Sequence, residues 1–364
     1  MKYKIPKRYL PLLTISVLLL FASSGCKTKE KQLIQNYKET TESSTFRVMF
    51  YNTENFFDIE DDPITDDAEF LPEGSMKWNA YKYNDKLQKI AKVIVAVGGE
   101  QGKGLVGMCE IENRKVLNDL VRYTPLAAGG GYEIIHKDSR DPRGIDVALL
   151  YKKSYFRLLF FDFYEFCSPS DSSKSRDILY AKGIVKNIDT LHVFVNHWPS
   201  RRGGQEGSEN KRTISARILK HQVDSILRIN KDAKIVIMGD FNDEPIDKSI
   251  HEVLQAQDSA DLKPGGLFNF MYAYKMKGMG SYKFQSEWNM LDQIICSYAL
   301  VGQKGLLYAG YRDAHIFSTD WMMTDDIKFP GKKPFRTFQG PKYLGGYSDH
   351  LPVYLDIHVK TVKL

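Results

Sequence analysis

Two short segments of the sequence place carboxylates beside hydrogen-bonding side chains in a pattern that suits phosphate-ester hydrolysis. Gly239-Asp240-Phe241-Asn242 follows an apolar run at 234–238, and Ser348-Asp349-His350 precedes another at 351–357. Metal-dependent hydrolytic sites are commonly built from such side chains. Asp240 could deprotonate a water and Asn242 could hold a phosphate oxygen, so the two segments predict an enzyme.

Further polar residues stand where other apolar runs end. If these runs are neighbouring strands, the polar side chains converge on one rim of the fold. They are Asn52 after 46–51, Glu110 after 105–109, and Asn196 with His197 after 191–195.

Some of these motifs also have a simpler structural interpretation. Glu110 could cap the helix that follows it, although Glu112 and Asn113 are better placed to do so, which leaves Glu110 for a metal. The segment 239–242 could be only an acidic turn held by hydrogen bonds from side chains to the backbone. The apolar strand that runs into this turn favours the functional interpretation.

Two more carboxylates lie within apolar runs, where an unpaired charge is costly. We expect His197 to be the partner of Asp146, which would orient the imidazole as the acid of a catalytic triad does. Pairing of Asp146 with Arg143 or another cation is an equal alternative. Asp292 has His350 as its natural partner. The sequence thus predicts two Asp/His pairs.

Candidate substrate contacts flank the first histidine. Alone, His197 would more often be a satisfied core or surface residue, but Asn196 and Arg201 beside it suit an anionic substrate. Other cations lie nearby, and the segment before Ser348 interleaves cations with aromatic residues, which can hold phosphates and stack bases. Nucleic acid is therefore the favoured substrate, with a solvated loop as a nearly equal interpretation of that segment. The cations are Arg202, Lys211, Arg212, Arg217, Lys328, Lys332, Lys333, Arg336 and Lys342, and the aromatic residues are Phe329, Phe335, Phe338, Tyr343 and Tyr347.

The first 25 residues have the composition of an export signal. A basic start precedes an apolar run at 9–22, which is short for a membrane span, and a small-residue cleavage site. Cys26 resembles the lipid-modified first residue of bacterial lipoproteins, with ordinary signal cleavage as the alternative. Residues 26–45 would link this anchor to the folded part. We therefore expect an exported protein, lipid-anchored in the cell envelope.

Charge and cysteine content limit the possible classes. Residues 1–25 hold four of the positive charges, so the formal net charge falls from +6 to +2 without them. Charge alone therefore does not argue for nucleic-acid binding. The three other cysteines give no disulfide framework, and two lie in apolar runs as buried thiols. No Pro/Gly/Ser-rich hinge divides residues 46–364, which indicates one domain, expected to be monomeric.

Strand-like runs recur along the chain, and several are continuously apolar, as expected of strands covered on both faces. Helical periodicity lies between some of them, most clearly at 209–229. This mixture predicts an α/β fold, a four-layer sandwich in which two packed, mixed β-sheets are flanked by helices. The expected strands are 46–51, 105–109, 132–136, 145–151, 156–163, 191–195, 234–238, 290–296 and 351–357, and the other expected helices are 85–97 and 115–122.

With these motifs in this order, residues 46–359 resemble the endonuclease/exonuclease/phosphatase superfamily, which includes pancreatic deoxyribonuclease, abasic-site endonucleases, bacterial sphingomyelinases and inositol polyphosphate phosphatases. The resemblance implies two packed sheets between helical layers and hydrolysis of phosphate esters with Mg²⁺ or Mn²⁺. It also implies in-line attack by water on a phosphodiester or phosphomonoester.

The resemblance further implies roles for individual residues, and it leaves open which histidine acts as acid or base. Asp146 stands where some members carry a Glu behind the first histidine, and Arg143 would contact phosphate. The implied metal-binding residues are Asn52, Glu110 and Asp349, and the implied catalytic residues are His197, Asp240, Asn242, Asp292 and His350.

Other functions are weighed against a nuclease. Lipid headgroups and small phosphate esters are alternative substrates for the same chemistry, since an anchor on Cys26 would hold the enzyme at a membrane. A calcineurin-like dinuclear phosphatase is excluded because its early Asp-x-His and its Gly-Asn-His motifs are missing. A catalytically inactive envelope-binding lipoprotein is disfavoured because every expected carboxylate and histidine is present.

Overall fold

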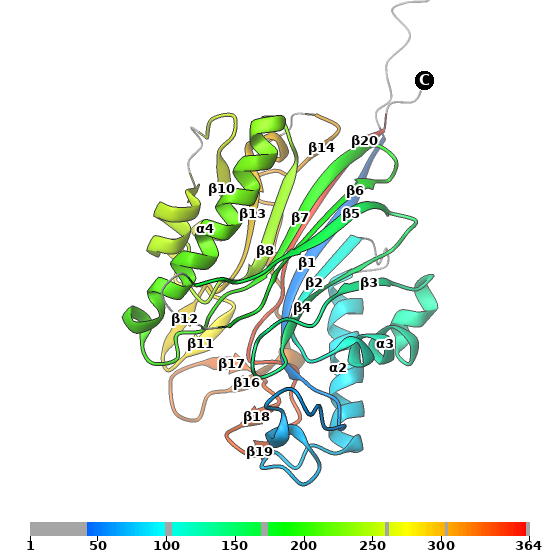
Figure 1. Cartoon of the computed structure of the whole chain (residues 1–364), viewed down its shortest axis with the longest axis vertical. Helices are drawn as coiled ribbons and strands as arrows, with labels where there is room; N and C mark the ends of the chain where they lie inside the picture. The colour runs from blue at the N-terminus through cyan, green and yellow to red at the C-terminus, as the bar shows by residue number, and fades with distance from the viewer. Residues whose placement is uncertain (1–41, 99–103, 169–173, 259–261, 303–304, 362–364) are drawn as a thin grey trace, which may run out of the picture. The chain divides into compact units, whose positions relative to one another are not determined.

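A computed structural model describes residues 42–98, 104–168, 174–258, 262–302 and 305–361 of the chain (Figure 1). Ser43–Thr361 forms one compact unit. The predicted export signal and Cys26 lie outside the described residues, as does most of the predicted linker 26–45, whose last four residues belong to the first strand. Within the described part, no helix is long and apolar enough to cross a membrane.

The first large sheet has seven strands, and the parallel pair β1 and β2 lies at its centre. It is a mixed sheet, because β4 runs antiparallel to β2. Its strands in order are β14 (Leu307–Tyr308), β20 (Val353–Thr361), β1 (Glu42–Phe56), β2 (Gly104–Ile111), β4 (Asp146–Tyr151) and β3 (Glu133–His136), with β15 (Ala314–Ile316) paired to β20.

The second large sheet also has seven strands and is mixed, since β7 and β8 are parallel while β8 and β13 are antiparallel. Its strands in order are β5 (Phe156–Tyr164), β6 (Ile178–Val185), β7 (Asp189–His197), β8 (Ile235–Asp240), β13 (Asp292–Ser297), β10 (Leu267–Asn269) and β9 (Ala256–Gln257).

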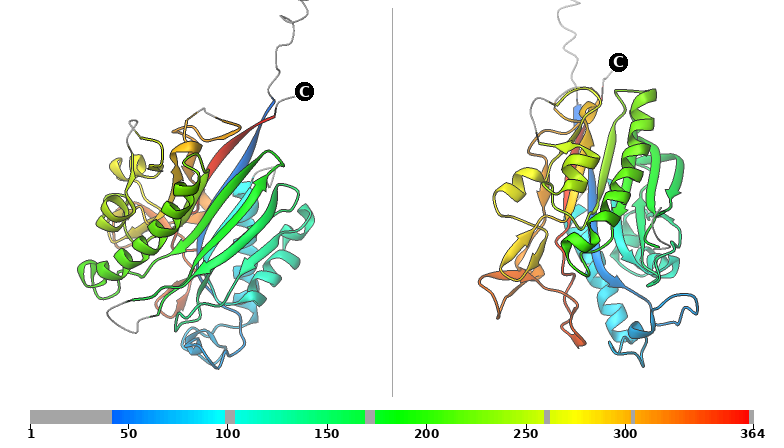
Figure 2. Two further views of the ribbon diagram at one scale, coloured as in Figure 1. Left: turned by 45° about the horizontal axis from the view of Figure 1, so that its top comes forward. Right: turned by 60° about the vertical axis from the view of Figure 1, so that its left-hand side comes forward.

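The alternation of side chains along the central strands explains the layers. Val48 and Phe50 of β1 lie in the apolar core between the two sheets, whereas Met49 packs with the helices α2 (Ala80–Gly98) and α3 (Arg114–Arg122). In the same way, Val193 and Val195 of β7 face the shared core, and Phe194 packs against α4 (Gln205–Ile229). The resulting order of helix, sheet, sheet and helix confirms the predicted four-layer sandwich (Figure 2).

Local signals in the sequence account for the helix boundaries and faces. Asn113 caps α3, because its side chain accepts a hydrogen bond from the Val116 amide at 3.1 Å. Val223 of α4 is buried against the second sheet, with Ile218 and Ile226 partly buried beside it. Glu110 is therefore not used as the cap of α3.

Short elements connect the large ones and cover one end of the sheets. The three small hairpins are β11 (Tyr282–Phe284) with β12 (Glu287–Asn289), β16 (Met323–Asp325) with β17 (Lys332–Pro334), and β18 (Phe338–Gln339) with β19 (Lys342–Tyr343). The short helices are η1 (Ala68–Phe70), η2 (Pro125–Gly129), the π-helix η3 (Ser249–Leu254), α5 (Tyr272–Met276), η4 (Tyr298–Leu300) and η5 (Asp320–Met322).

Every strand and helix expected from the sequence overlaps an observed one. The sequence did not predict β6, because Lys182 and Gly183 interrupt its apolar run. The three small hairpins were not predicted either, since they are held by turns and neighbouring segments rather than by an apolar pattern. Cys109 and Cys296 are buried free thiols, as predicted.

Candidate active site

The end of the parallel pair β1 and β2 brings the first two predicted residues together. Asn52 is paired in register with Cys109, the residue before Glu110. Asn52 Nδ2 donates to Glu110 Oε1 at 3.3 Å, and the Asn55 amide donates to Oε2 at 2.8 Å. Glu110 has a φ of 59°, and this left-handed backbone coincides with the irregular end of the β2–β4 pairing. Both carboxylate oxygens are thereby fixed.

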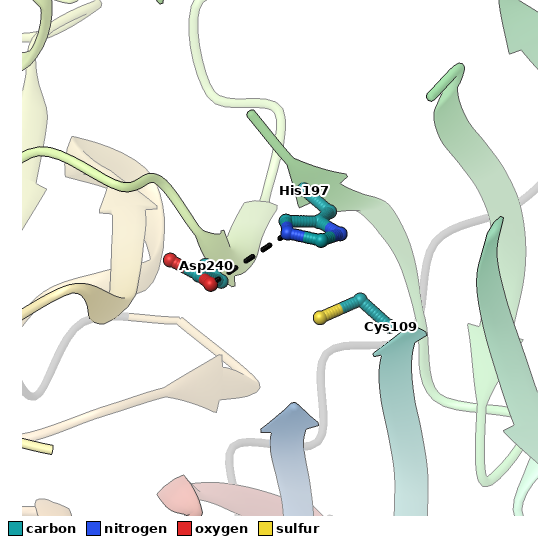
Figure 3. A group of neighbouring side chains, drawn as sticks. All are labelled: Cys109, His197 and Asp240. Carbon is teal, nitrogen blue, oxygen red and sulfur yellow. Dashed lines mark ion pairs between the residues drawn. The ribbon is translucent and has the colours of Figure 1, made fainter. Parts of the chain in front are cut away.

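The parallel pair β7 and β8 supplies the next two residues, since His197 is directly opposite Asp240. Gly239 permits this close pairing: a Cβ at that position would lie 2.5 Å from the Asn196 carbonyl oxygen. His197 Nε2 lies 3.8 Å from Asp240 Oδ2 (Figure 3) and 3.9 Å from Glu110 Oε1. These distances exceed a hydrogen bond and leave room for a bridging oxygen atom.

The two sheets meet at Asp240. Its Oδ2 accepts a hydrogen bond from Asn52 Nδ2 of the other sheet at 3.1 Å, and its Oδ1 accepts from the Asn242 amide at 2.9 Å. Burial raises the pKa of Asp240, an effect that the charge of His350 opposes. Asp240 is therefore a buried carboxylate that binds a proton more readily than an exposed one.

The second predicted histidine is held by the predicted carboxylate. His350 Nδ1 lies 2.6 Å from Asp292 Oδ2, which also accepts the Ser281 hydroxyl at 2.5 Å. The Tyr282 ring packs on the imidazole, with 4.8 Å between the ring centroids. His350 Nε2 points to the same carboxylate as His197 Nε2, at 4.0 Å from Asp240 Oδ2. The predicted pair of Asp292 with His350 is confirmed.

The two imidazoles have opposite charge preferences. Burial lowers the pKa of His197 well below its ordinary value, and the nearby charge of Arg176 lowers it further. Burial acts in the same direction on His350, but the Asp292 and Asp240 carboxylates outweigh it and raise the pKa of His350 well above its ordinary value. These shifts favour the neutral form of His197 and the protonated form of His350.

A pocket of about 720 Å³ opens over these groups. Its cationic lining comes from Arg143, Arg201 and Arg202. The predicted reacting groups in its wall are Glu110, His197, Asp240, Asn242, Asp349 and His350.

The sequence as a whole matches a family model described as the Endonuclease/Exonuclease/phosphatase family, over residues 47–359. The chain belongs to this family. Members of the endonuclease/exonuclease/phosphatase family are metal-dependent hydrolases of phosphate esters, so the protein is an enzyme of that class. No curated protein matches the sequence closely enough to count as a relative.

Solved structures share the fold over most of the chain. A humanized *D. rerio* TDP2 is 13% identical, with a TM-score of 0.52 over 86% of this chain and 98% of that one. A family protein from *Bacteroides thetaiotaomicron* is 14% identical, with a TM-score of 0.50 over 88% and 97% of the two chains. At such identities the likeness establishes the fold alone.

The carboxylates of the pocket fit the divalent metal that the family uses. The Glu110 and Asp349 side chains are 17% and 20% exposed, in contrast to 3% for Asp240. Carboxylate oxygens are the donors that Mg²⁺ and Mn²⁺ prefer. Cys109 lies close to His197 and Asp240 (Figure 3), but burial raises the pKa of its thiol well above the ordinary value. The thiol stays protonated and is a poor ligand.

A network behind Asp349 was missed by the sequence analysis. Arg336 Nη2 lies 3.1 Å from Asp349 Oδ2, and its Nε lies 3.3 Å from Glu54 Oε1. Glu54 is also 4.0 Å from the fully buried Lys86, which donates to Thr337 Oγ1 at 2.5 Å. The signal was present, because Glu54 and Lys86 are charges inside buried elements and each needed a partner.

The predicted pairing of Asp146 with His197 is wrong. Asp146 Oδ2 lies 3.2 Å from Nε2 of His136, a residue of the neighbouring strand β3, and Oδ1 accepts the Ser139 amide at 2.8 Å. His197 Nδ1 has no hydrogen-bond partner among the described residues. Asp146 is not among the residues that line the pocket, whereas Arg143 is, with its Nε 3.5 Å from Asp141 Oδ1.

The predicted substrate contact by Asn196 is also wrong. Asn196 is fully buried, donates to the Met238 carbonyl at 3.2 Å and accepts from Trp198 Nε1 at 3.2 Å, so its amide is consumed within the sheet. Arg201 does line the pocket, although it also binds Asp247 Oδ2 at 2.7 Å.

A buried ion pair holds the loop that carries Asn242. Arg212 was expected among the cations near the substrate, but its Nε lies 2.7 Å from Asp243 Oδ1 and both side chains are buried. Asn242 has a φ of 49°, and its side-chain Nδ2 donates to the Trp198 carbonyl at 2.9 Å. The ion pair therefore holds the strained turn rather than the substrate.

Proposed function

We propose that the protein is a Mg²⁺- or Mn²⁺-dependent phosphodiesterase that cleaves nucleic acid. The observation that carries the proposal is the position of Asp240, whose Oδ2 faces His197 at 3.8 Å and His350 at 4.0 Å across a pocket lined with cations. One oxygen atom of a water or a phosphate can bridge Asp240 to an imidazole, and the pocket over these groups has room for the rest of a phosphate ester. Glu110 and Asp349 would hold the metal, with Asn52 orienting Glu110.

Each residue has a step in this proposal. Asp240 takes the proton of the attacking water, which is then aligned with the scissile bond. His350 donates from Nε2 to a phosphate oxygen and stabilises the charge that builds there, while Asp292 holds its ring. Asn242 donates the second hydrogen of its amide to the phosphate. The metal, when bound, acts as a Lewis acid on the phosphate oxygens.

His197 is placed to accept or relay a proton rather than to supply positive charge, because burial lowers the pKa of its imidazole and favours the neutral form. Its Nε2 faces both Asp240 and Glu110. We therefore assign the electrostatic role to His350 and the proton-relay role to His197.

Two observations support nucleic acid as the substrate. Arg143, Arg201 and Arg202 line the pocket and suit a phosphodiester backbone better than a single phosphate. Among the structures of this fold, a *D. rerio* TDP2 was solved with a single-strand DNA product, at 14% identity and a TM-score of 0.50 over 86% of this chain and 99% of that one. Sphingomyelin and phosphomonoesters are the competing substrates.

The test is cleavage of plasmid DNA, single-stranded RNA, sphingomyelin vesicles and a phosphomonoester panel with Mg²⁺, Mn²⁺ or EDTA. Nucleic-acid cleavage that requires metal and is lost in Asp240→Asn and His350→Gln supports the proposal. Asp313→Asn is the matched control, because Asp313 forms a similar pair with His358 in a different part of the fold. Cleavage of lipid or monoester alone would overturn the nucleic-acid assignment.

Export and lipid attachment through Cys26 rest on the sequence pattern alone. A lipid anchor would place the enzyme at a membrane facing the envelope, where extracytoplasmic nucleic acid or lipid would be its substrate.

A further inference from the structure

A second pocket adjoins the catalytic one. It encloses about 620 Å³ and shares Tyr282, Phe284 and Asp349 with the first pocket. The hairpins β11–β12 and β16–β17, whose strands contact each other, supply most of its wall. The two pockets are therefore neighbouring parts of one cleft that extends from the reacting carboxylates to the hairpins.

Hydrogen bonds hold the wall of the second pocket in place. In the turn between β16 and β17, the Lys328 and Phe329 amides donate to Asp326 Oδ1 at 3.1 Å and 3.3 Å. Lys283 of β11 donates to Asp326 Oδ2 at 3.2 Å and to the Pro330 carbonyl at 2.8 Å. Lys283 thus ties one hairpin to the other, while Lys328 in the turn between β16 and β17 is exposed to solvent.

The charges of the second pocket favour an anion. Its lining contains four cations and two carboxylates. Lys283 and Lys333 share Asp326, and Arg336 is held by Asp349. Lys328 forms no ion pair among the described residues. Its charge is the one in this pocket left for a ligand.

That cation stands beside an aromatic face. Lys328 Nζ lies 5.4 Å from the centroid of the Phe329 ring, and both residues line the same pocket. A cation next to an aromatic ring matches the two parts of a nucleotide, since phosphate binds the cation and the base stacks on the ring.

We infer that the second pocket binds the nucleotides that extend from the scissile phosphodiester of single-stranded nucleic acid, with Lys328 on a phosphate and Phe329 under a base. The inference rests on the proposed nuclease function and deepens it by naming the substrate form. Stacking on Phe329 requires a base whose face is free, which a duplex does not offer inside a pocket.

The experiment compares a substrate too small to reach the second pocket with substrates that fill it. The small substrate is bis(p-nitrophenyl) phosphate, and the others are single-stranded oligodeoxynucleotides of two, four and eight nucleotides. We expect kcat/KM of the wild-type protein to rise with length. In Lys328→Gln and Phe329→Leu, we expect the octanucleotide value to fall by about tenfold, with hydrolysis of the small ester unchanged.

Binding gives a second readout that a general folding defect would not produce. Anisotropy of a labelled octanucleotide in EDTA, measured against salt concentration, should show a slope smaller by about 0.7 in Lys328→Gln, the value for one lost phosphate contact on a single strand. The controls are Lys231→Gln and Phe161→Leu, which change an exposed lysine and an exposed phenylalanine outside the cleft.

The outcomes separate this inference from the proposed function. If the wild-type protein cleaves neither the small ester nor the oligonucleotides, the proposed function fails. If it cleaves both and the two variants lose nothing, or lose equally on all substrates, the pocket assignment alone is overturned. The two variants are also assayed on sphingomyelin vesicles, and a loss confined to that substrate would assign the pocket to a lipid headgroup and overturn the inference.

Discussion

His350 Nδ1 lies 2.6 Å from Asp292 Oδ2, and Asp292 begins strand β13 of the second sheet while His350 lies three residues before β20 of the first. The imidazole is thus positioned by a carboxylate that is itself buried and fixed by Ser281. The protonation of His350 therefore depends on the packing of the two sheets, which places Asp292 beside it.

Asp292→Asn should therefore lower kcat strongly while it changes the thermal stability of the protein little. Asparagine keeps the shape of the side chain but removes the charge that raises the pKa of His350. We expect kcat to fall by about 10²-fold, the lower range for loss of one donor that stabilises transition-state charge. Steady-state kinetics and thermal denaturation of the same samples check this. An unchanged kcat would refute the role given to His350.

Gly239→Ala should destabilise the fold and impair the site together. The added Cβ would meet the Asn196 carbonyl oxygen at 2.5 Å, so β7 and β8 must separate where His197 faces Asp240. Overpacking of this kind costs about 1–3 kcal/mol. Gly207→Ala in α4 is the matched control, because its Cβ meets nothing within 4 Å and alanine suits a helix. Urea unfolding of both variants measures the difference, and equal stabilities would contradict the prediction.

Arg212→Ala should be strongly destabilising, since it removes the closer of the two arginines that pair with the buried Asp243 and leaves only Arg201 at 3.5 Å. Breaking one side of a buried ion pair costs about 3–5 kcal/mol. Arg217→Ala removes an exposed arginine of the same helix and should change stability little. If chemical denaturation gave the two variants the same loss, Arg212 would be a surface cation in solution.

Stability should decrease on acidification through His192. Burial, aided by the charge of Lys182, lowers the pKa of His192 to about 4 in the folded protein, and the neutral ring pairs with the Tyr180 hydroxyl at 2.7 Å. An unfolded histidine takes up its proton near its ordinary value of about 6.5. The unfolded state therefore gains protons first, and stability is lost as pH falls from about 6.5 towards 4.

His192→Gln removes this titration without adding a charge. Relative to the wild type, the variant should show a flatter loss of stability between pH 7 and pH 4. Denaturant titrations at several pH values give the difference curve. A difference that does not change with pH would show that folding leaves the pKa of His192 unchanged and would contradict the prediction.

Cys26→Ser tests the anchor predicted from the sequence. If Cys26 carries lipid, the wild-type protein should label with a fatty-acid probe and sediment with membranes, and the variant should do neither. Ordinary signal cleavage would leave both proteins unlabelled and distribute them alike.

The residues that converge in the site could be predicted because each one stands at the end of a strand that the sequence reveals. Asn52, Glu110, His197 and Asp240 each follow an apolar strand, and parallel neighbours bring such ends to one edge. Asp292 was predictable for another reason, since a carboxylate inside an apolar run must find a partner. His350 was the partner expected for it.

Other contacts depended on information that strand patterns do not hold. Asp146 pairs with His136 rather than with His197 because of the register of β3 on β4. The apolar pattern of the strands does not reveal this register. Asn196 ends a strand like the others, yet its side chain turns inward to the Met238 carbonyl. The second pocket arises from turns fixed by Asp326, where no periodic pattern exists.

The hydrogen bond from Asn52 to Asp240 joins the two sheets at 3.1 Å. The geometry of the active site therefore depends on how one sheet is placed on the other. A slip of one sheet on the other by a fraction of an ångström changes the spacing of the reacting groups before it exposes any apolar surface. Heating should therefore extinguish catalysis at a lower temperature than it melts the fold, and core substitutions between the sheets should alter turnover from a distance.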